Sequence, residues 1–183
     1  MDRIALVTYE GAPDLSEDDR LLLTPLKKNN IQADAAVWDD PAVRWEEFDA
    51  LILRSCWDYH RRSDEFLRWI ADREREKAAL WNPPGLVRWN HHKGYLKSFA
   101  GTGVQIASTV HLDRGSRVSL AELMERQGWT DAVIKPTISA SAYRTRLASR
   151  ATAVCDQNEF DSLLEEAGMM VQEFLPEIRT EGE

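Results

Sequence analysis

Short apolar runs separated by polar segments dominate the first half of the chain. Three such runs lie near residues 4–8, 31–38 and 49–54, and each resembles a buried parallel strand. Between the first two, Ser16 can cap a helix with acidic residues in its first turn, leucines along one face and lysines in its last turn. A strand followed by a helix begins a βαβ unit, so the pattern predicts a small α/β domain with a parallel sheet.

A longer helical pattern follows the third run. Ser63 is placed to cap this helix, and the apolar side chains between Phe66 and Ile70 fall at helical spacing, which indicates core packing. The sequence Asn-Pro-Pro-Gly at residues 82–85 interrupts the pattern. We take the segment after it as the domain boundary, so the expected domains are residues 1–89 and 90–183.

The second half mixes strands and helices in a different order. Asn90 can cap a helix that continues to Phe99, and capping boxes at Ser119 and Asp156 each open a helix that ends at a glycine. The expected strands cover residues 104–110, 132–135, 143–147, 151–154 and 169–174. This order predicts an α+β lobe after the α/β domain, and the chain as a whole falls in the α/β class.

Composition and charge narrow the class of protein. With 183 residues, 43% of them hydrophobic, and seven tryptophans, the chain should fold and bury a core. Its formal net charge of −8 argues against nucleic acid or an anionic membrane as the partner. No apolar run approaches the roughly 20 residues of a membrane span, and the start lacks signal-peptide architecture. We therefore expect a cytoplasmic protein.

The cysteines and histidines do not form metal-ligand patterns. Cys56 and Cys155 lie far apart in the sequence, so we expect reduced, inert thiols rather than a zinc site or a disulfide. The adjacent His91 and His92 would point in different directions on a helix. The sequence therefore gives no residues for a metal site.

One candidate for anion binding lies at the end of the strand near residue 134. Lys135 places a cation at the strand end, and Pro136 stops the strand from continuing as a ladder donor. In the loop at 137–142, Thr137, Ser139, Ala140, Ser141 and Ala142 are small residues whose N–H groups and hydroxyls a ligand can approach. This combination suits a polyphosphate. The simpler alternative is a lysine at a strand end followed by an ordinary surface loop.

A second candidate follows the third strand of the first half. Residues 54–60 combine Arg54, Trp57 and Asp58 with Tyr59 and a histidine. Ligands of open parallel sheets gather beyond the carboxyl ends of the strands, which makes this group a candidate site. The alternative is structural: the aromatic side chains pack on the sheet while the arginine and the aspartate pair with each other.

Three separate elements together have the layout of an ATP clamp. Lys93 lies in an expected first helical turn, where a cation opposes the helix dipole and an anion would compensate it. Lysines from different elements, here Lys93 and Lys135, can neutralise adjacent phosphates without a Walker-type loop. The strand end at 171–175 can offer backbone groups to an adenine edge and an apolar wall to its face.

Four segments carry a resemblance to the ATP-grasp superfamily. They are LRSCWDYH at 53–60, NPPGLVRWNHHKGYL at 82–96, VIKPTISASAYRT at 133–145 and VQEFLPEIRTEGE at 171–183. In order and spacing these segments are similar to a group of ATP-grasp ligases that includes the O-ureidoserine cyclo-ligase of cycloserine biosynthesis. The resemblance implies an N-terminal pre-ATP-grasp parallel-sheet domain, followed by the first α+β lobe of the grasp.

The resemblance also implies roles for individual residues. Both lysines would contact ATP phosphates, with Lys135 as the catalytic cation, and the loop at 137–142 would fold over the phosphates. This loop departs from the glycine-rich form common in the superfamily, since it contains no glycine. The residues implied to bind the nucleotide are Lys93, Lys135, Ser139, Ala140, Ser141, Glu173, Phe174, Leu175 and, at the ribose hydroxyls, Glu183.

The implied activity is an ATP-dependent ligation of a carboxylate to an amine through an acyl phosphate. Arg54, Trp57 and Asp58 are the candidates to hold the small substrate. Magnesium would be bound by a second lobe, which family members carry after the hinge and which does not follow Glu183 here. We therefore expect the 183-residue chain to be inactive alone, and an apolar edge near residues 169–175 to be exposed and open to homo-oligomer formation.

Two other readings remain open at this point. One is a non-catalytic nucleotide-binding or interaction protein that uses the same lobes without chemistry. The other is an α/β domain with a NAD-type site, which lacks support because no G-x-G-x-x-G follows the first strand.

Overall fold

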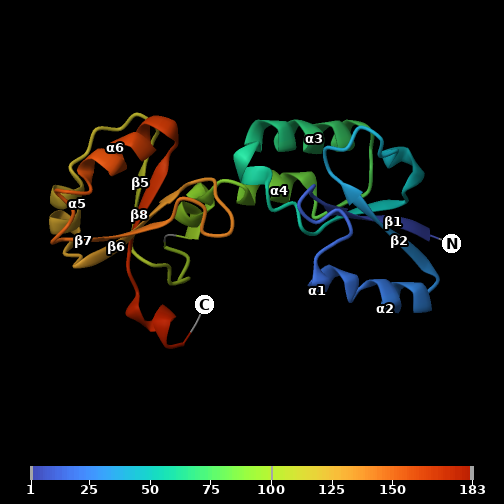
Figure 1. Ribbon diagram of the computed structural model, residues 1–183, viewed down its shortest axis with the longest axis horizontal. Coiled ribbons are helices and arrows are strands. Elements are labelled where there is room, and N and C mark those ends of the chain that lie inside the picture. The colour runs from blue at the N-terminus through green and yellow to red at the C-terminus, as the bar shows by residue number, and fades with distance from the viewer. Residues whose placement is uncertain (1, 100, 182–183) are drawn as a thin grey trace. The chain divides into compact units, whose positions relative to one another are not determined.

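The computed structural model describes residues 2–99 and 101–181 and divides into two compact units, Met1–His91 and His92–Glu183 (Figure 1). Each unit has its own sheet and its own hydrophobic core. The expectation of independent domains at 1–89 and 90–183 remains a prediction.

The first unit contains the parallel sheet that the sequence predicted. Its strands are β1 (Asp2–Thr8), β2 (Ile31–Val37), β3 (Ala50–Leu53) and β4 (Leu80–Trp81), in the order β2-β1-β3-β4. All neighbouring strands are parallel, and β1 lies at the centre with Ile4 opposite Ala33 on one side and Ala50 on the other. Both faces of β1 are consequently buried, which explains its almost continuous apolar run.

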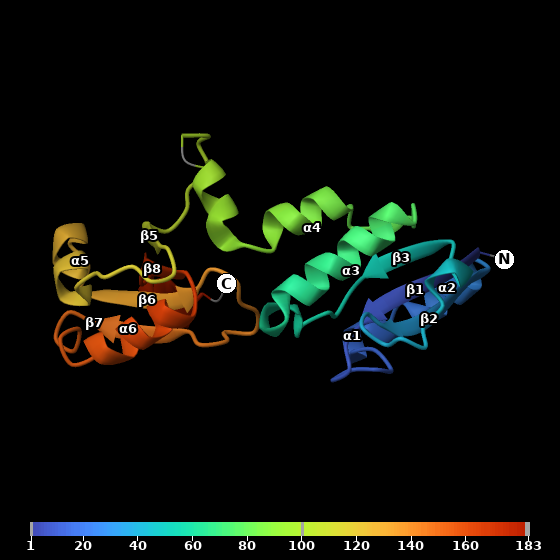
Figure 2. The ribbon, with the colours of Figure 1, turned by 90° about the horizontal axis from the view of Figure 1, so that it is seen from above.

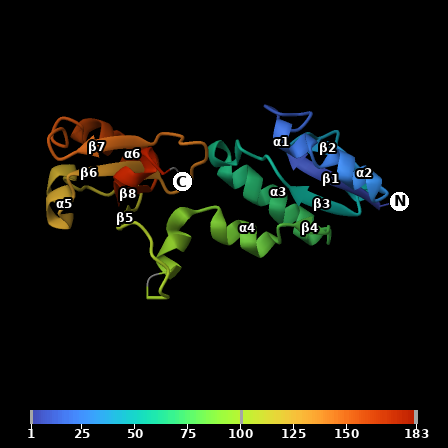
Figure 3. The same cartoon turned by 90° about the horizontal axis from the view of Figure 1, so that it is seen from below.

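Helices cover both faces of this sheet. The short helices α1 (Glu17–Arg20) and α2 (Leu23–Lys28) lie on one face, and α3 (Ser63–Arg75) and α4 (Pro84–Asn90) lie on the other (Figures 2 and 3). The larger core lies under α3, where Trp38, Trp45, Phe66 and Trp69 pack against one another. The 3-10 helices η1 (Trp45–Glu47) and η2 (Tyr59–Arg61) complete the unit.

Three local expectations for this unit were wrong. The helix after Ser16 is split in two, because Pro25 cannot donate to the carbonyl of Leu21 and its ring clashes with that carbonyl. Ser63 is the first residue of α3 rather than its cap, and its hydroxyl lies 2.7 Å from Nε2 of His91. Asn90 is the last residue of helix α4, which begins at Pro84, so Asn90 caps no later helix.

The second unit is built on an antiparallel sheet. Its strands are β5 (Thr109–Leu112), β6 (Asp131–Pro136), β7 (Arg146–Ser149) and β8 (Met169–Glu173), in the order β5-β8-β6-β7. Helices α5 (Leu120–Gln127) and α6 (Gln157–Glu166) pack against one core with Ile134, Ala148 and Val171 of the sheet. The 3-10 helices are η3 (Lys93–Phe99) and η4 (Pro176–Arg179).

The sequence predicted the helices of this unit better than its strands. Ser119 accepts from the N–H of Glu122 at 3.3 Å and Gly128 closes α5 with a φ of 75°. Asp156 makes no capping bond, because its carboxylate accepts from the Thr152 hydroxyl at 2.6 Å. The strand expected at 104–110 begins only at Thr109, and residues 151–154 form turns rather than a strand.

The expected apolar edge near residues 169–175 does not exist as an edge. Strand β8 pairs with β5 on one side and β6 on the other, and Met169, Met170 and Val171 are fully buried. The sheet edges are β5 and β7, so β8 offers no edge for oligomer formation. No helix in the described part of the chain is both long and apolar enough to cross a bilayer.

Candidate functional site

A pocket of about 690 Å³ in the second unit gathers residues from four segments of the sequence. Its lining includes every described residue that the sequence analysis assigned to nucleotide binding. The last assigned residue, Glu183, lies outside the described residues. The lining residues are Lys93, Ala107, Val133, Lys135, Ser139, Ala140, Ser141, Ala142, Thr145, Gln172, Glu173, Phe174, Leu175 and Ile178.

Strand periodicity places Lys135 in the pocket. Along β6, Ala132, Ile134 and Pro136 are buried, whereas the alternate positions are only partly buried, so Lys135 projects to the opposite face from Ile134. Its Nζ donates to Oε1 of Gln172 on β8 at 2.8 Å. A cation at this strand end is therefore held by the neighbouring strand.

A hydrogen-bond chain fixes the orientation of Gln172. The hydroxyl of Thr109 donates to the carbonyl of Ala107 at 2.7 Å, and it accepts from Nε2 of Gln172 at 2.8 Å. Because the amide nitrogen faces the threonine, the amide oxygen faces Lys135. Strands β5, β8 and β6 thus cooperate to position one ammonium group.

Lys93 supplies the second ammonium group. Its backbone N–H donates to the carbonyl of Thr137 at 2.7 Å, and its Nζ donates to the carbonyl of Ser139 at 2.5 Å. Burial lowers the pKa of Lys93, and the positive charge of Lys135 lowers it further. No ion pair of Lys93 is found among the described residues. An anion bound between the lysines would remove this repulsion.

The loop after Lys135 is tied to the body of the unit. Thr137 and Ser139 are buried, and their hydroxyls donate to the carbonyls of Gly168 and Pro136 at 3.2 and 3.3 Å. The expectation that these hydroxyls serve as free donors was therefore wrong. The residues of this loop that line the pocket are Ser139, Ala140, Ser141 and Ala142.

The end of this loop adopts a backbone that normally requires glycine. Ser141, Ala142 and Arg144 have φ values of 49°, 55° and 53°, which are left-handed conformations that cost energy for residues with a Cβ atom. The absence of glycine noted in the sequence therefore does not prevent a tight loop beside the pocket.

The end of β8 forms the apolar wall of the pocket. The N–H of Phe174 donates to the carbonyl of Asp131 at 3.2 Å, whereas the N–H of Leu175 makes no hydrogen bond within the described residues. The guanidinium of Arg179 lies 4.9 Å from the centre of the Phe174 ring and stacks on it. This wall can accept a flat ring and offer it one backbone donor.

The candidate substrate residues Arg54, Trp57 and Asp58 lie in the first unit. Nε of Arg54 donates to the buried carboxylate of Asp19 at 2.7 Å, while Asp58 accepts from Trp38 at 2.9 Å and from Arg62 at 2.8 Å. The direct pairing of Arg54 with Asp58, considered as the structural alternative, is therefore wrong.

The role of Asp19 was not predicted from the sequence. This residue is 2% exposed, although it reads as a common acidic residue of a first helical turn. Burial would raise the pKa of Asp19, but hydrogen bonds from Ser55 and Arg54 outweigh it and lower the pKa. Asp19 therefore stays ionised and holds Arg54 at the end of β3.

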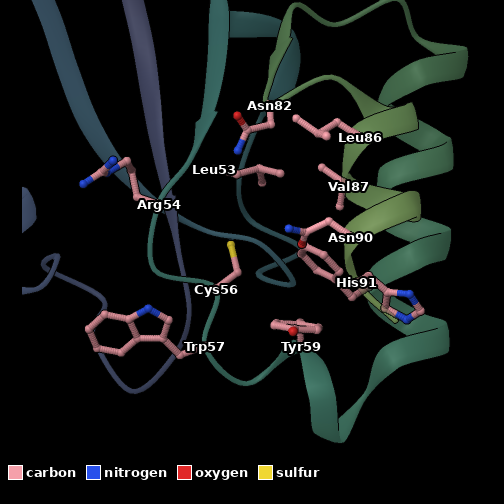
Figure 4. Close-up of a pocket in the computed structure, with 11 residues that line it drawn as sticks. Leu53, Arg54, Cys56, Trp57, Tyr59, Asn82, Leu86, Val87, Asn90 and His91 are labelled. Atoms are coloured by element: carbon pink, nitrogen blue, oxygen red, sulfur yellow. The ribbon is translucent and has the colours of Figure 1, made fainter. Parts of the chain in front are cut away.

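Arg54 and Trp57, but not Asp58, line a second cavity, which lies within the first unit (Figure 4). Asn82 and Asn90 also line this cavity, and the sequence analysis assigned neither of them a role. No group of three or more histidine, cysteine or acidic side chains that could hold a metal ion is found among residues 2–99 and 101–181.

Known proteins resemble this chain in sequence and in fold. Residues 4–82 match the family described as D-cycloserine synthetase DcsG, N-terminal domain. The chain is 33% identical over 140 residues to the cycloserine biosynthesis protein DcsG of Streptomyces lavendulae, an alignment that covers 75% of this chain and 46% of that protein. The crystal structure of D-cycloserine synthetase DcsG matches 98% of this chain with a TM-score of 0.86 and 27% identity.

More distant structures share the fold across both units. A RimK domain ATP-grasp protein from Sphaerobacter thermophilus has a TM-score of 0.70 at 15% identity over 95% of this chain. The D-alanine–D-alanine ligase of Bacillus anthracis has a TM-score of 0.67 at 13% identity over 96% of it. The chain has the fold of the N-terminal part of an ATP-grasp ligase. It spans 46% of the length of the curated relative and 58–64% of the chains in these three solved structures.

Proposed function

We propose that this chain is the nucleotide-binding part of an ATP-dependent ligase that joins a carboxylate to an amine through an acyl phosphate. The observation that carries the proposal is the pocket in the second unit, where two lysines, a tight loop and an apolar strand end line one cavity. A triphosphate needs cations and a closely approaching loop, and a purine needs an apolar wall.

The residues of the pocket divide into a phosphate end and a base end. Lys93 and Lys135 would bind the phosphates, and the loop with Ser139, Ala140 and Ser141 would cover them. At the base end, the N–H of Leu175 would donate to a ring nitrogen and the carbonyl of Glu173 would accept from the amino group, with Phe174 between them. Glu183 remains the candidate for the ribose hydroxyls.

When bound, ATP would supply the phosphoryl group that activates the carboxylate. This chain would position the phosphates and offset their charge, with Lys135 stabilising the charge that develops on the transferred group. Magnesium would assist the transfer, and its ligands are expected in the part of such ligases that follows this fold. Arg54, Trp57 and Asp58 remain candidates for holding the small acid or amine.

Calorimetric titration with magnesium and a non-hydrolysable ATP analogue tests the proposal. A Lys135→Ala variant should bind at least about tenfold more weakly, since a charge-assisted hydrogen bond to phosphate is lost. Lys97→Ala is the matched control, because Lys97 is an exposed lysine of η3 that does not line the pocket. Absent binding, or an equal loss in the control, would contradict the proposal.

A non-catalytic nucleotide-binding protein would give the same titration result. The two functions differ in turnover by the longer protein to which this fold belongs. Trapping with hydroxylamine separates them, because an acyl phosphate yields a hydroxamate and simple nucleotide binding does not.

A further inference from the structure

The first unit contains a cavity of about 260 Å³ beyond the ends of β3 and β4, beside α4. This cavity is separate from the pocket of the second unit, since no residue lines both. Figure 4 shows the side chains that line it, with Cys56 pointing into the cavity from below β3 and Asn82 and Asn90 facing it from either end of α4. The lining residues are Leu53, Arg54, Cys56, Trp57, Tyr59, Phe66, Asn82, Leu86, Val87, Asn90 and His91.

The walls of this cavity are fixed by contacts outside it. The ring of His91 at the end of α4 lies 2.7 Å from the hydroxyl of Ser63 at the start of α3. Arg88 of α4 pairs with Glu74 of α3 at 2.9 Å. The ring of Phe66 is buried against Trp38 at a centroid distance of 5.4 Å. The cavity is therefore preformed, which lowers the entropic cost of binding a ligand.

The charged groups around the cavity are neutralised by their neighbours. Arg54 pairs with the buried Asp19, and Asp58 turns away to Trp38 and Arg62. Burial raises the pKa of the Cys56 thiol, with Asp58 and Asp19 adding to the rise, so this thiol stays neutral. A charged ligand would therefore meet only charges that already have a partner within the protein.

Two carboxamides supply the polar contacts instead. The side chains of Asn82 and Asn90 make no hydrogen bond within the described residues, and both are accessible to solvent. Each carboxamide offers two donors and an acceptor without a net charge. Between them lie the apolar side chains of Leu53, Leu86 and Val87, as Figure 4 shows. This arrangement complements an apolar body that ends in an uncharged group able to donate and accept.

We propose that this cavity binds a compact, uncharged ligand group of that kind, and that Asn82 and Asn90 determine its specificity. That the group belongs to a substrate rests on the proposed function: it would be a part of the acid or amine that does not react. The carboxamides then select for neutral ligands, while the apolar wall limits their size.

Three small molecules that share one carbon skeleton and differ in the charge of their end group test this selectivity. Isovaleramide, isovalerate and isoamylamine are titrated into the full 183-residue chain, labelled with ¹⁵N, in the absence of nucleotide. The amide should shift the side-chain NH₂ signals of Asn82 and Asn90 and the backbone signals of Cys56 and Val87. The anion and the cation should leave these signals in place at the same concentrations.

Substitution to aspartate should switch the selectivity. In Asn90→Asp the amide should bind about tenfold more weakly, because two donors are lost, and isoamylamine should now shift the cavity signals. Asn82→Asp should likewise weaken binding of the amide and allow binding of isoamylamine. A gain of amine binding cannot come from misfolding. Asn158→Asp, at an exposed position of α6 in the other unit, is the control and should change neither titration.

Equal shifts from all three probes, shifts outside the cavity, or none from any probe up to its solubility would overturn the proposal. These outcomes are independent of the nucleotide titration. A chain that binds the ATP analogue but not the amide refutes the second site alone, and the reverse result refutes the proposed function.

Discussion

At the scale of single residues, the environment of Lys93 disfavours its positive charge, and a bound anion would offset this. Its ammonium group is half-buried, points at the Ser139 carbonyl and lies close enough to Lys135 for the two charges to repel. The folded protein therefore disfavours the charged form of Lys93 relative to the unfolded chain, where the ordinary pKa of 10.5 applies.

The lowered pKa of Lys93 predicts that the stability of the fold depends on pH. Between the lowered folded pKa and 10.5, the unfolded chain binds more protons than the folded one, so this contribution to stability rises with pH. The difference in unfolding free energy between the wild type and Lys93→Met should therefore shift in favour of the wild type as the pH rises toward 10.5. Urea denaturation of both proteins across this range measures it. A difference that is constant with pH would show that the lysine is not perturbed.

The strained loop gives a second prediction at the scale of one residue. Ala142 has a φ of 55°, whereas Ala140 in the same loop does not have a positive φ. Ala142→Gly should raise the free energy of unfolding by about 1 kcal/mol, because the Cβ clash of the left-handed conformation disappears.

Ala140→Gly is the matched comparison for this loop. It should lower the free energy of unfolding by roughly 0.5 kcal/mol, since glycine there only adds entropy to the unfolded chain. Denaturant midpoints of the two variants decide the matter, and changes of the same sign would refute the assignment of strain to position 142.

At the scale of elements, the sequence pattern predicts those features that depend only on neighbouring residues, such as the buried face of a strand or the cap of a helix. Strand β6 alternates buried and partly buried residues along its length, so its face and the position of Lys135 follow from the sequence. The capping box at Ser119 likewise needs only neighbouring residues. The predictions failed near Pro25 and Pro84, although both prolines are visible in the sequence. A proline inside a helix interrupts it, and a proline at the first helical position favours the start of a helix.

Other features depend on which elements become neighbours. The sequence of β8 shows an apolar run, but only the pairing with β5 and β6 shows that the run lies at the centre of a sheet. Asp19 and Arg54 are 35 residues apart in the sequence, and their ion pair arises from the arrangement of strands β1 and β3. The cavity between Asn82 and Asn90 arises in the same way, since it needs β3 and α4 side by side.

The cooperation of three strands around Lys135 can be tested through Gln172. Replacing it by glutamate places a carboxylate where Oε1 now accepts from Lys135 at 2.8 Å. Gln172→Glu should weaken binding of the ATP analogue by at least about tenfold, because the carboxylate neutralises the lysine and repels phosphate.

Gln172→Leu serves as the comparison, since it removes the hydrogen bond without adding charge. Its affinity for the analogue should fall less than that of Gln172→Glu, and the loss in Gln172→Glu should shrink at high salt. Equal losses in the two variants, measured by calorimetry, would show that Gln172 acts on the fold and not on the charge at Lys135.

At the scale of the whole molecule, the described chain carries two units with different chemistry. The second unit contains the pocket with the lysines, and the first contains the cavity with the carboxamides. Each of these two cavities is lined by residues of one unit only. The predictions for one cavity can therefore be tested independently of those for the other. Under the proposed function, the pocket with the lysines would take the nucleotide and the cavity with the carboxamides would take part of the molecule that is activated.

The most direct test of the account is a comparison of ligands of decreasing phosphate content. The affinities of the ATP analogue, ADP, AMP and adenosine are measured calorimetrically for the wild type, Lys135→Ala and Lys97→Ala. The account predicts that Lys135→Ala weakens the analogue and ADP strongly but leaves adenosine unchanged, while Lys97→Ala changes none of them. An equal loss for adenosine, or no difference between the two lysine variants, would contradict the assignment of Lys135 to the phosphate end of a nucleotide site.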